Sequence, residues 1–170
     1  MKRLLLLLAL VLFPSILAAQ PYQFGILIGA AEPMEDGFDL KFGEGVREVF
    51  FGARLETNTM FNVKLGQTDS PVTPSGLESL GNHSVDYVLG QVEYQFDEVW
   101  GSSSVFAGPG LYRSESGGED ATELGFSGGV SASFPVNRRF AFMVELAYHW
   151  VDFEQRYTFI SATGGFRVAF

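Results

Sequence analysis

The chain has 170 residues, of which 20 are acidic, 11 are basic and none is cysteine. The formal net charge of −9 argues against nucleic acid as a partner, because proteins that bind a phosphate backbone are rich in Lys and Arg. Without cysteine there is no disulfide and no lipidated thiol, so packing and hydrogen bonds must hold the fold. The 17 Phe and 20 Gly residues favour many twisted strands packed around a small interior.

The first 19 residues (1–19) are predicted to be a secretory signal peptide. Lys2 and Arg3 give the segment its positive start, an apolar run follows, and Ala19 ends a cleavage site of small residues. A membrane-spanning helix is the weaker interpretation, because Pro14 interrupts a run that is shorter than the roughly 20 apolar residues of a span. Removing the segment leaves one domain, 20–170, with a net charge of −11.

Alternation of apolar and polar residues predicts four strands in the first half of the mature chain. They are expected at 22–31, 47–57, 61–66 and 84–96. A very short turn at Asn58 and Thr59 joins the second and third strands as a tight hairpin. The apolar residues of the fourth strand change phase along its length, which predicts a β-bulge near Gly90.

Four more strands are predicted in the second half, at 103–113, 124–134, 140–151 and 158–170. The fifth strand has two nearly equivalent faces, so its facing stays open, and Pro109 within it requires a bulge or an unpaired position. The sixth, seventh and eighth strands alternate well, and in the last one every second residue from Ile160 to Phe170 is non-polar.

The seven connections alternate between long and short. They are 32–46, 58–59, 69–82, 97–102, the polar loop 114–122, 135–139 and a modest final one at 152–156. A barrel inserted into a membrane from one side predicts this alternation, with short turns on the side of insertion and long loops beyond. The strand lengths also match the roughly 9 to 11 residues that a tilted strand needs to cross a bilayer.

The facing of the side chains favours lipid over a soluble core. A soluble barrel would have to hold the bulky apolar set inside, where it would overfill the interior, and would leave Gly, Ser and Ala outside. The residues expected to face lipid include Phe51, Leu55, Val63, Leu65, Phe126, Val130, Phe142, Val144, Phe166 and Val168. The predicted fold is therefore all-β: a closed, eight-stranded, antiparallel up-and-down transmembrane β-barrel, lined by glycines and serines and apolar outside.

Six charged residues fall on the inward-facing positions, three of each sign. They are Arg54, Glu56, Lys64, Glu93, Glu145 and Arg167. A buried charge without a partner costs on the order of 3 to 5 kcal/mol, so we predict an internal salt-bridge network that fills the lumen. The alternative is that some of these groups lie in interfacial water.

Aromatic residues gather at the strand ends, as interfacial girdles require. Those expected at the short-turn end are Tyr22, Phe61, Phe96, Trp100, Phe134, Phe140 and Phe170, and those at the other end are Tyr112, Tyr148 and Trp150.

The last strand ends in FRVAF, and with this ending the mature chain resembles the small outer-membrane β-barrel family typified by OmpA and OmpX. The resemblance implies that Phe166, Val168 and Phe170 form the signal read by the barrel-assembly machinery. It also implies passage through the periplasm with chaperones, and a location in the outer membrane among its lipids and lipopolysaccharide. A peptidoglycan-binding domain after the barrel is absent, so tethering to the cell wall is not expected. The protein is expected to be a monomer.

The chain offers little chemistry. His83 and Ser84 are adjacent in an extended segment and so point to opposite sides, and the His-x-Ser spacing of lipid A deacylases is absent. Two separated histidines and no cysteine make no zinc site. We therefore predict no enzyme, no metal and no cofactor.

The long connections are acidic, opposed mainly by Lys41 and Arg156. Their carboxylates are Glu32, Glu35, Asp36, Asp39, Glu44, Asp69, Glu78, Glu115, Glu119, Asp120, Asp152 and Glu154. Such a surface is either simply solvated or bridged by divalent cations to lipopolysaccharide phosphates.

The leading hypothesis for function is a non-enzymatic barrel that acts in envelope integrity or surface interaction. The alternatives are a narrow porin-like channel, a lipid A-modifying enzyme and a soluble lipocalin-like carrier.

Overall fold

The structure is a computed structural model that describes residues 22–34, 44–70, 83–99, 101–116, 119–152 and 157–170, so the predicted signal peptide lies outside the described residues. No helix in these ranges is long and apolar enough to cross a membrane. The strands are β1 (Tyr22–Pro33), β2 (Glu44–Glu56), β3 (Thr59–Ser70), β4 (His83–Glu98), β5 (Gly101–Ser116), β6 (Glu119–Pro135), β7 (Phe140–Val151) and β8 (Tyr157–Ala169).

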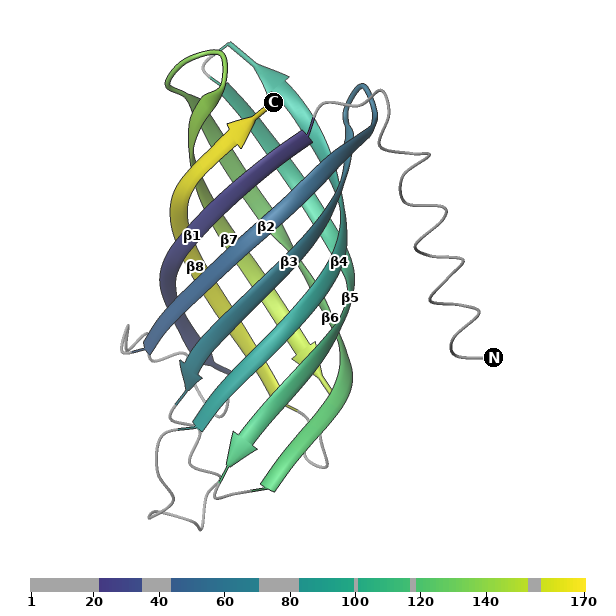
Figure 1. The fold of residues 1–170 in the computed structure, drawn as a ribbon, viewed down its shortest axis with the longest axis vertical. Helices are drawn as coiled ribbons and strands as arrows, with labels where there is room; N and C mark the ends of the chain where they lie inside the picture. The colour runs from purple at the N-terminus through teal and green to yellow at the C-terminus, as the bar shows by residue number, and fades with distance from the viewer. Residues whose placement is uncertain (1–21, 35–43, 71–82, 100, 117–118, 153–156) are drawn as a thin grey trace.

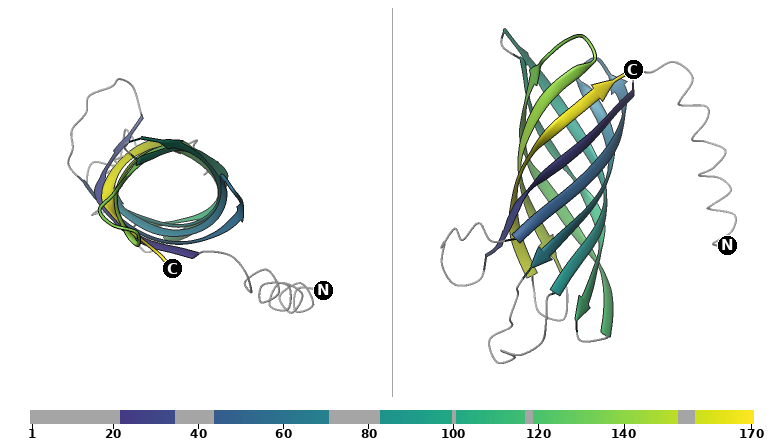
Figure 2. Two further views of the ribbon diagram at one scale, coloured as in Figure 1. Left: turned by 90° about the horizontal axis from the view of Figure 1, so that it is seen from above. Right: turned by 60° about the vertical axis from the view of Figure 1, so that its left-hand side comes forward.

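The eight strands form one closed barrel in which each strand pairs antiparallel with its neighbours in sequence and β8 pairs with β1 (Figures 1 and 2). The predicted fold class is confirmed. Because the number of strands is even, the first and last strands have their outer ends on the same side of the barrel, and the pairing of β8 with β1 brings these ends together. Tyr22 and Phe170 exchange two backbone hydrogen bonds of 2.9 Å, at the end that also carries the short β2–β3 turn (Figure 1).

The register fixes the tilt of the strands. Following cross-strand partners once around the barrel from Tyr22 leads to Glu32, ten residues further along β1. With strands about 4.8 Å apart and a rise of about 3.3 Å per residue, this offset tilts the strands by about 40°. At that tilt the outward row from Phe140 to Trp150 spans about 25 Å along the axis, the height of an outer-membrane apolar belt.

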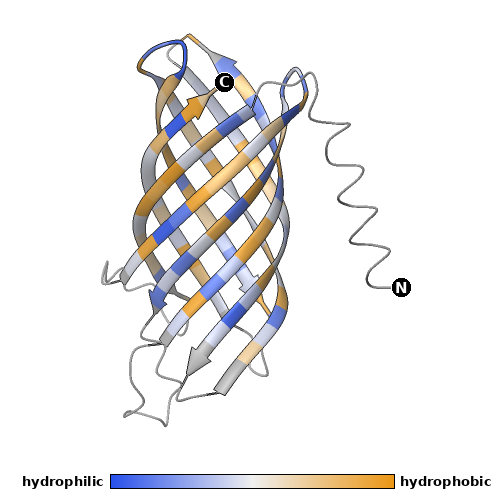
Figure 3. Cartoon of the chain, viewed as in Figure 1, coloured by the Kyte–Doolittle hydropathy of each residue, from blue (hydrophilic) through white to orange (hydrophobic). Residues whose placement is uncertain are grey.

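Large apolar side chains cover the outside of every strand. Ile28 is 65% exposed and Leu124 is 67% exposed, and polar and apolar residues alternate along the strands in Figure 3. All ten residues predicted to face lipid lie on the outer wall. Phe96, Phe134 and Phe140 are exposed at the short-turn end, as the predicted girdle requires. Trp100 lies outside the described residues.

The predicted bulge near Gly90 is wrong. The ladder between β3 and β4 runs without interruption from the pair Thr59 and Tyr94 to the pair Ser70 and His83. The phase change in the sequence arises because the long-loop half of β4 places large apolar residues inside the barrel, whereas in the short-turn half those residues point outward. The inward apolar residues of the long-loop half are Val85, Tyr87 and Leu89.

The facing of β5, which the sequence leaves open, is settled by the structure. Val105 and Leu111 point outward, whereas Phe106 and Tyr112 are buried inside. Pro109 keeps its partner on β6 and lacks one on β4, so an unpaired position accommodates it without a shift in register.

The predicted polar loop 114–122 is mostly strand. β5 and β6 remain paired up to Ser116 and Glu119, because polar residues beyond a membrane can still form ladder hydrogen bonds. The pairing of β6 with β7 begins only at Gly125. Among the described residues, Glu119 to Glu123 therefore have a strand neighbour on the β5 side alone, whereas the carbonyl of Leu124 accepts a hydrogen bond of 3.5 Å from the amide of Asp152. In Figure 1 the ends of β5 and β6 reach beyond the ends of the other strands.

Candidate functional site

The lumen is the first candidate site, and it holds more large side chains than predicted. Serines and glycines line it, but the buried apolar residues there include Leu27, Phe50, Leu89, Phe106 and Phe159. Inward glycines make room for inward rings on neighbouring strands. A Cβ on Gly25 would lie 2.2 Å from the Phe50 ring, and one on Gly66 would lie 2.2 Å from the Tyr87 ring. The small residues therefore serve to fit large ones into a narrow barrel.

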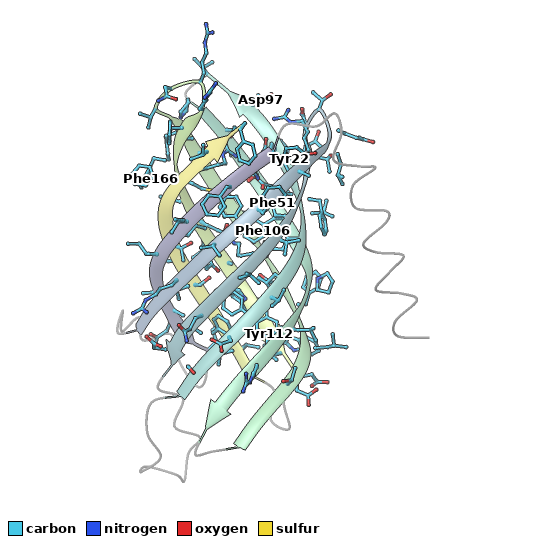
Figure 4. All side chains as sticks on the ribbon, in the orientation of Figure 1. Tyr22, Phe51, Asp97, Phe106, Tyr112 and Phe166 are labelled. Carbon is cyan, nitrogen blue, oxygen red and sulfur yellow. The ribbon has the colours of Figure 1, made fainter. Side chains whose placement is uncertain are left out.

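The long-loop half of the lumen is closed by a cluster of rings that we call the aromatic plug: Tyr87, Tyr112, His149 and Phe159. None of the four is more than 2% exposed. The His149 and Phe159 rings stack with centroids 4.2 Å apart, and the Tyr87 centroid lies 5.3 Å from that of His149. Tyr112 was predicted to belong to the outer girdle, and its place in the lumen corrects that. Figure 4 marks its position in the long-loop half.

The middle of the lumen holds three buried charges, Glu48, Lys64 and Glu145. The Lys64 ammonium donates a hydrogen bond to Glu145 and lies 3.6 Å from Glu48 Oε2, and the three side chains are at most 3% exposed. The Tyr87 hydroxyl donates to Glu48 Oε1 over 2.6 Å, which joins this triad to the aromatic plug. Lys64 Nζ also lies 5.2 Å from the centroid of the Phe106 ring.

Glu48 is not among the six predicted interior charges, although it lies within the predicted second strand, 47–57. Its even spacing from Gly52 and Arg54 is the signal that would have placed it inside the barrel.

The short-turn half contains a chain of polar groups. Arg167 donates to Ser133 Oγ over 2.8 Å and to Gln23 Oε1 over 3.3 Å. The Gln23 amide donates to Asn62 over 2.9 Å, and Asn62 donates to Glu93 over 2.6 Å. Arg167 and Glu93 are thus connected through two amides and not by direct contact.

Arg54 and Glu56 do not join these groups. A β-bulge between them shifts the register against β3, so that Glu56 is exposed opposite Thr59. Arg54 donates to the carbonyl of Thr57 over 2.7 Å, within its own turn. Of the six predicted interior charges, Lys64 and Glu145 are therefore in contact, Glu93 and Arg167 are linked indirectly, and two lie at the turn.

A serine and a histidine do meet in the lumen. His149 Nε2 lies 3.1 Å from Ser161 Oγ, and its Nδ1 lies 3.0 Å from the Tyr112 hydroxyl. The pair has the spacing of a nucleophile and base, but all three residues are at most 1% exposed, so no substrate reaches them. The side chain of His83 lies outside what the structure describes. In the described ranges no group of three His, Cys, Asp or Glu residues could hold a metal ion.

The outer surface of the long-loop end is the second candidate site. Asp69, Asp86, Glu123 and Asp152 are exposed there. Several predicted rim carboxylates lie outside the described residues or have side chains that are not described: Glu35, Asp36, Asp39, Glu44, Glu78, Glu115, Glu119, Asp120 and Glu154. At the opposite end, the residues predicted as the assembly signal face outward on β8, and Phe166 is marked there in Figure 4.

No protein-family model matches the chain, and no curated protein matches it significantly. Solved structures do match. The neisserial surface protein A (NspA) is 18% identical with a TM-score of 0.63, covering 89% of this chain and 97% of its own. The chain has the fold of an OmpA/OmpX-like outer-membrane β-barrel.

Two further barrels of this type are similar. The attachment invasion locus protein Ail of Yersinia pestis is 13% identical with a TM-score of 0.56, covering 87% of this chain and 98% of its own. The N-terminal β-barrel domain of Pseudomonas aeruginosa OprF is 11% identical with a TM-score of 0.52, covering 86% and 96%. These neighbours support the predicted outer-membrane location, and at these identities the likeness is one of fold.

Proposed function

We propose that this OmpA/OmpX-like barrel is a monomeric, non-enzymatic and non-conducting protein of the outer membrane that acts through its acidic long-loop end, in envelope integrity or surface interaction. One observation carries the proposal: the aromatic plug and the central charge triad fill the lumen with buried, mutually bonded side chains. A filled lumen leaves the outer surfaces as the place where a partner can bind.

A narrow channel is the second candidate, and the polar chain in the short-turn half is what favours it. A water path would have to continue through the aromatic plug, where Tyr112 and Phe159 are fully buried. Planar-bilayer recording of the purified barrel separates the two functions. We expect no steady conductance, and discrete ohmic openings of the unaltered protein would establish the channel instead.

Catalysis on lipid A is disfavoured because the only Ser–His contact found in the described residues lies inside the lumen. Lipid acyl chains run along the outer wall and would not meet it. Mass spectrometry of lipid A from cells with and without the protein tests this directly. Identical lipid A profiles are expected, and a mass change equal to one acyl chain would overturn the proposal.

The partner that we propose for the long-loop end is lipopolysaccharide, bridged through divalent cations. Carboxylates at Asp69, Glu123 and Asp152 are exposed there, yet the described residues form no complete cation site. A calcium or magnesium ion prefers six or more oxygen ligands, so phosphates of the lipid would have to complete its shell.

The matching experiment measures lipopolysaccharide binding as magnesium is added. We expect binding to rise with magnesium in the unaltered protein and to rise much less in D69N/E123Q/D152N. D97N is the matched control, because Asp97 is an exposed carboxylate at the opposite end of the barrel. Binding that does not depend on magnesium would contradict the bridge.

For its assembly we propose that Phe166, Val168 and Phe170 are read by the barrel-assembly machinery after periplasmic chaperones deliver the chain. The last strand closes the barrel by pairing with both β1 and β7, so an unrecognised last strand leaves two open edges. F170S should lower the amount of folded protein in outer membranes, as measured by mobility on unboiled gels, while the exposed control V99S should not.

A further inference from the structure

The short β6–β7 turn has a fixed backbone. The amide of Val136 donates to the carbonyl of Phe140 over 2.8 Å, and the amide of Asn137 donates to the same carbonyl over 3.0 Å. The Asn137 side-chain oxygen accepts from the amides of Arg139 and Phe140 over 2.8 and 2.9 Å. An Asn that satisfies two following amides holds a turn in one conformation, so its side chains are presented from a defined scaffold.

The turn is also attached to the last strand. The amide of Ala169 donates to the carbonyl of Arg139 over 2.8 Å. This bond extends the β7–β8 ladder, which begins with the pair Phe140 and Val168. The turn therefore shares the rigidity of the barrel wall, unlike an ordinary surface loop.

This scaffold presents two cations and one apolar side chain. Arg138 and Arg139 are exposed, and Val136 between them and the girdle is 68% exposed. Within the described residues neither guanidinium takes part in an ion pair. Phe134 and Phe140 of the aromatic girdle directly flank the turn, so the two guanidiniums lie where the apolar belt ends and lipid phosphates begin.

The other short turns carry exposed carboxylates, and Arg54 beside the β2–β3 turn is half-buried and donates to the carbonyl of Thr57. Glu56 is exposed beside the β2–β3 turn, and Asp97 is exposed beside the β4–β5 turn, where Figure 4 labels it. The described part of this rim is thus acidic on one side and basic at the β6–β7 turn. Both exposed arginines in the described part of this rim, Arg138 and Arg139, therefore lie in one turn that hydrogen bonds hold to the last strand.

We propose that the β6–β7 turn binds the phosphate of an anionic phospholipid, such as phosphatidylglycerol, in the periplasmic leaflet. Each guanidinium can donate paired hydrogen bonds to phosphate oxygens, and Val136 packs against the upper part of the acyl chains. The site lies on the face opposite to the long loops, so it does not depend on what those loops bind.

The test titrates the purified full-length barrel in neutral detergent with phosphatidylglycerol or phosphatidylcholine and counts bound lipids by native mass spectrometry. Because each basic residue at an anionic surface contributes about five-fold, less after screening by salt, the unaltered protein should prefer phosphatidylglycerol by about ten-fold. R138Q/R139Q should reduce that preference to about two-fold or less on the same reasoning. R138K/R139K keeps the charge and should keep part of the preference.

The matched control is E56Q/D97N, which removes two charges of the other sign from the same rim and should leave the preference intact or raise it. Inorganic phosphate should not displace the lipid. Mobility on unboiled gels checks that each variant is folded. If R138Q/R139Q does not fold, the lipid preference of R138K/R139K is compared with that of the unaltered protein instead. An equal preference in the unaltered protein and R138Q/R139Q, a loss of preference in the control, or displacement by phosphate would each overturn the site.

Discussion

Replacing Lys64 with Met is the sharpest test of how the lumen is held together. Lys64 contacts two buried carboxylates, Glu48 and Glu145. Met has nearly the same length and flexibility, so the substitution leaves little empty space. Its effect should come from the two carboxylates, which then face each other in the lumen without a cation between them.

The magnitude follows from burial. All three side chains are at most 3% exposed, so water cannot replace the lost partner. Removing one member of a buried ion pair costs about 3 to 5 kcal/mol. The unfolding equilibrium should therefore shift by a factor of about a hundred to a few thousand.

The assay is reversible urea unfolding of the barrel in lipid vesicles, followed by tryptophan fluorescence. K64M should lower the free energy of unfolding by about 3 to 5 kcal/mol, and K64M/E48Q/E145Q should recover much of that loss because no charged member of the triad remains. A K64M protein within about 1 kcal/mol of the unaltered one would refute the reasoning. A triple variant less stable than K64M would refute it as well.

Three further predictions use the same unfolding measurement. G66A should cost about 1 to 3 kcal/mol because its Cβ would meet a buried ring, whereas the control G90A, with 3.6 Å to its nearest neighbour, should change little. L146R, in the middle of the outer belt, should cost about 2 to 4 kcal/mol, and L124R near the rim about 1 kcal/mol or less; equal costs would argue against the membrane placement. Y112F should cost about 1 kcal/mol by removing the hydrogen bond to the buried histidine, and no measurable loss would mean that the bond contributes nothing.

The strands and their closure could be predicted because alternation along a strand depends on the sequence alone. Outward positions such as Phe142, Val144 and Leu146 were placed correctly from this period. The facing of β4 and of Tyr112 could not be predicted. Both faces of β4 and of β5 carry large apolar residues, so the two-residue period does not distinguish the inside of the barrel from the outside. Pairing of inward glycines with rings on the next strand, as between Gly66 and Tyr87, becomes visible only once the register is known.

The grouping of the interior charges depends on features that lie outside any single strand. Lys64 and Glu145 are 81 residues apart and meet because strand tilt and the offset around the barrel bring them to one level. Arg54 and Glu56 were placed inside because their parity is correct, but one bulge before the turn moves Glu56 outside. Parity predicts the face, whereas register and bulges decide which charges meet.

Within the described residues, the stretch of β6 from Glu119 to Leu124 has no paired strand on the β7 side, where the Leu124 carbonyl accepts a single hydrogen bond from the amide of Asp152. This edge has a consequence for crowding in the membrane. A free edge offers backbone donors and acceptors to any extended chain that comes alongside, including the same edge of a second barrel. This segment reads EDATEL, with three carboxylates in six residues. The side chain of Glu123 is exposed here, so two copies paired edge to edge would bring like charges together, which disfavours that contact.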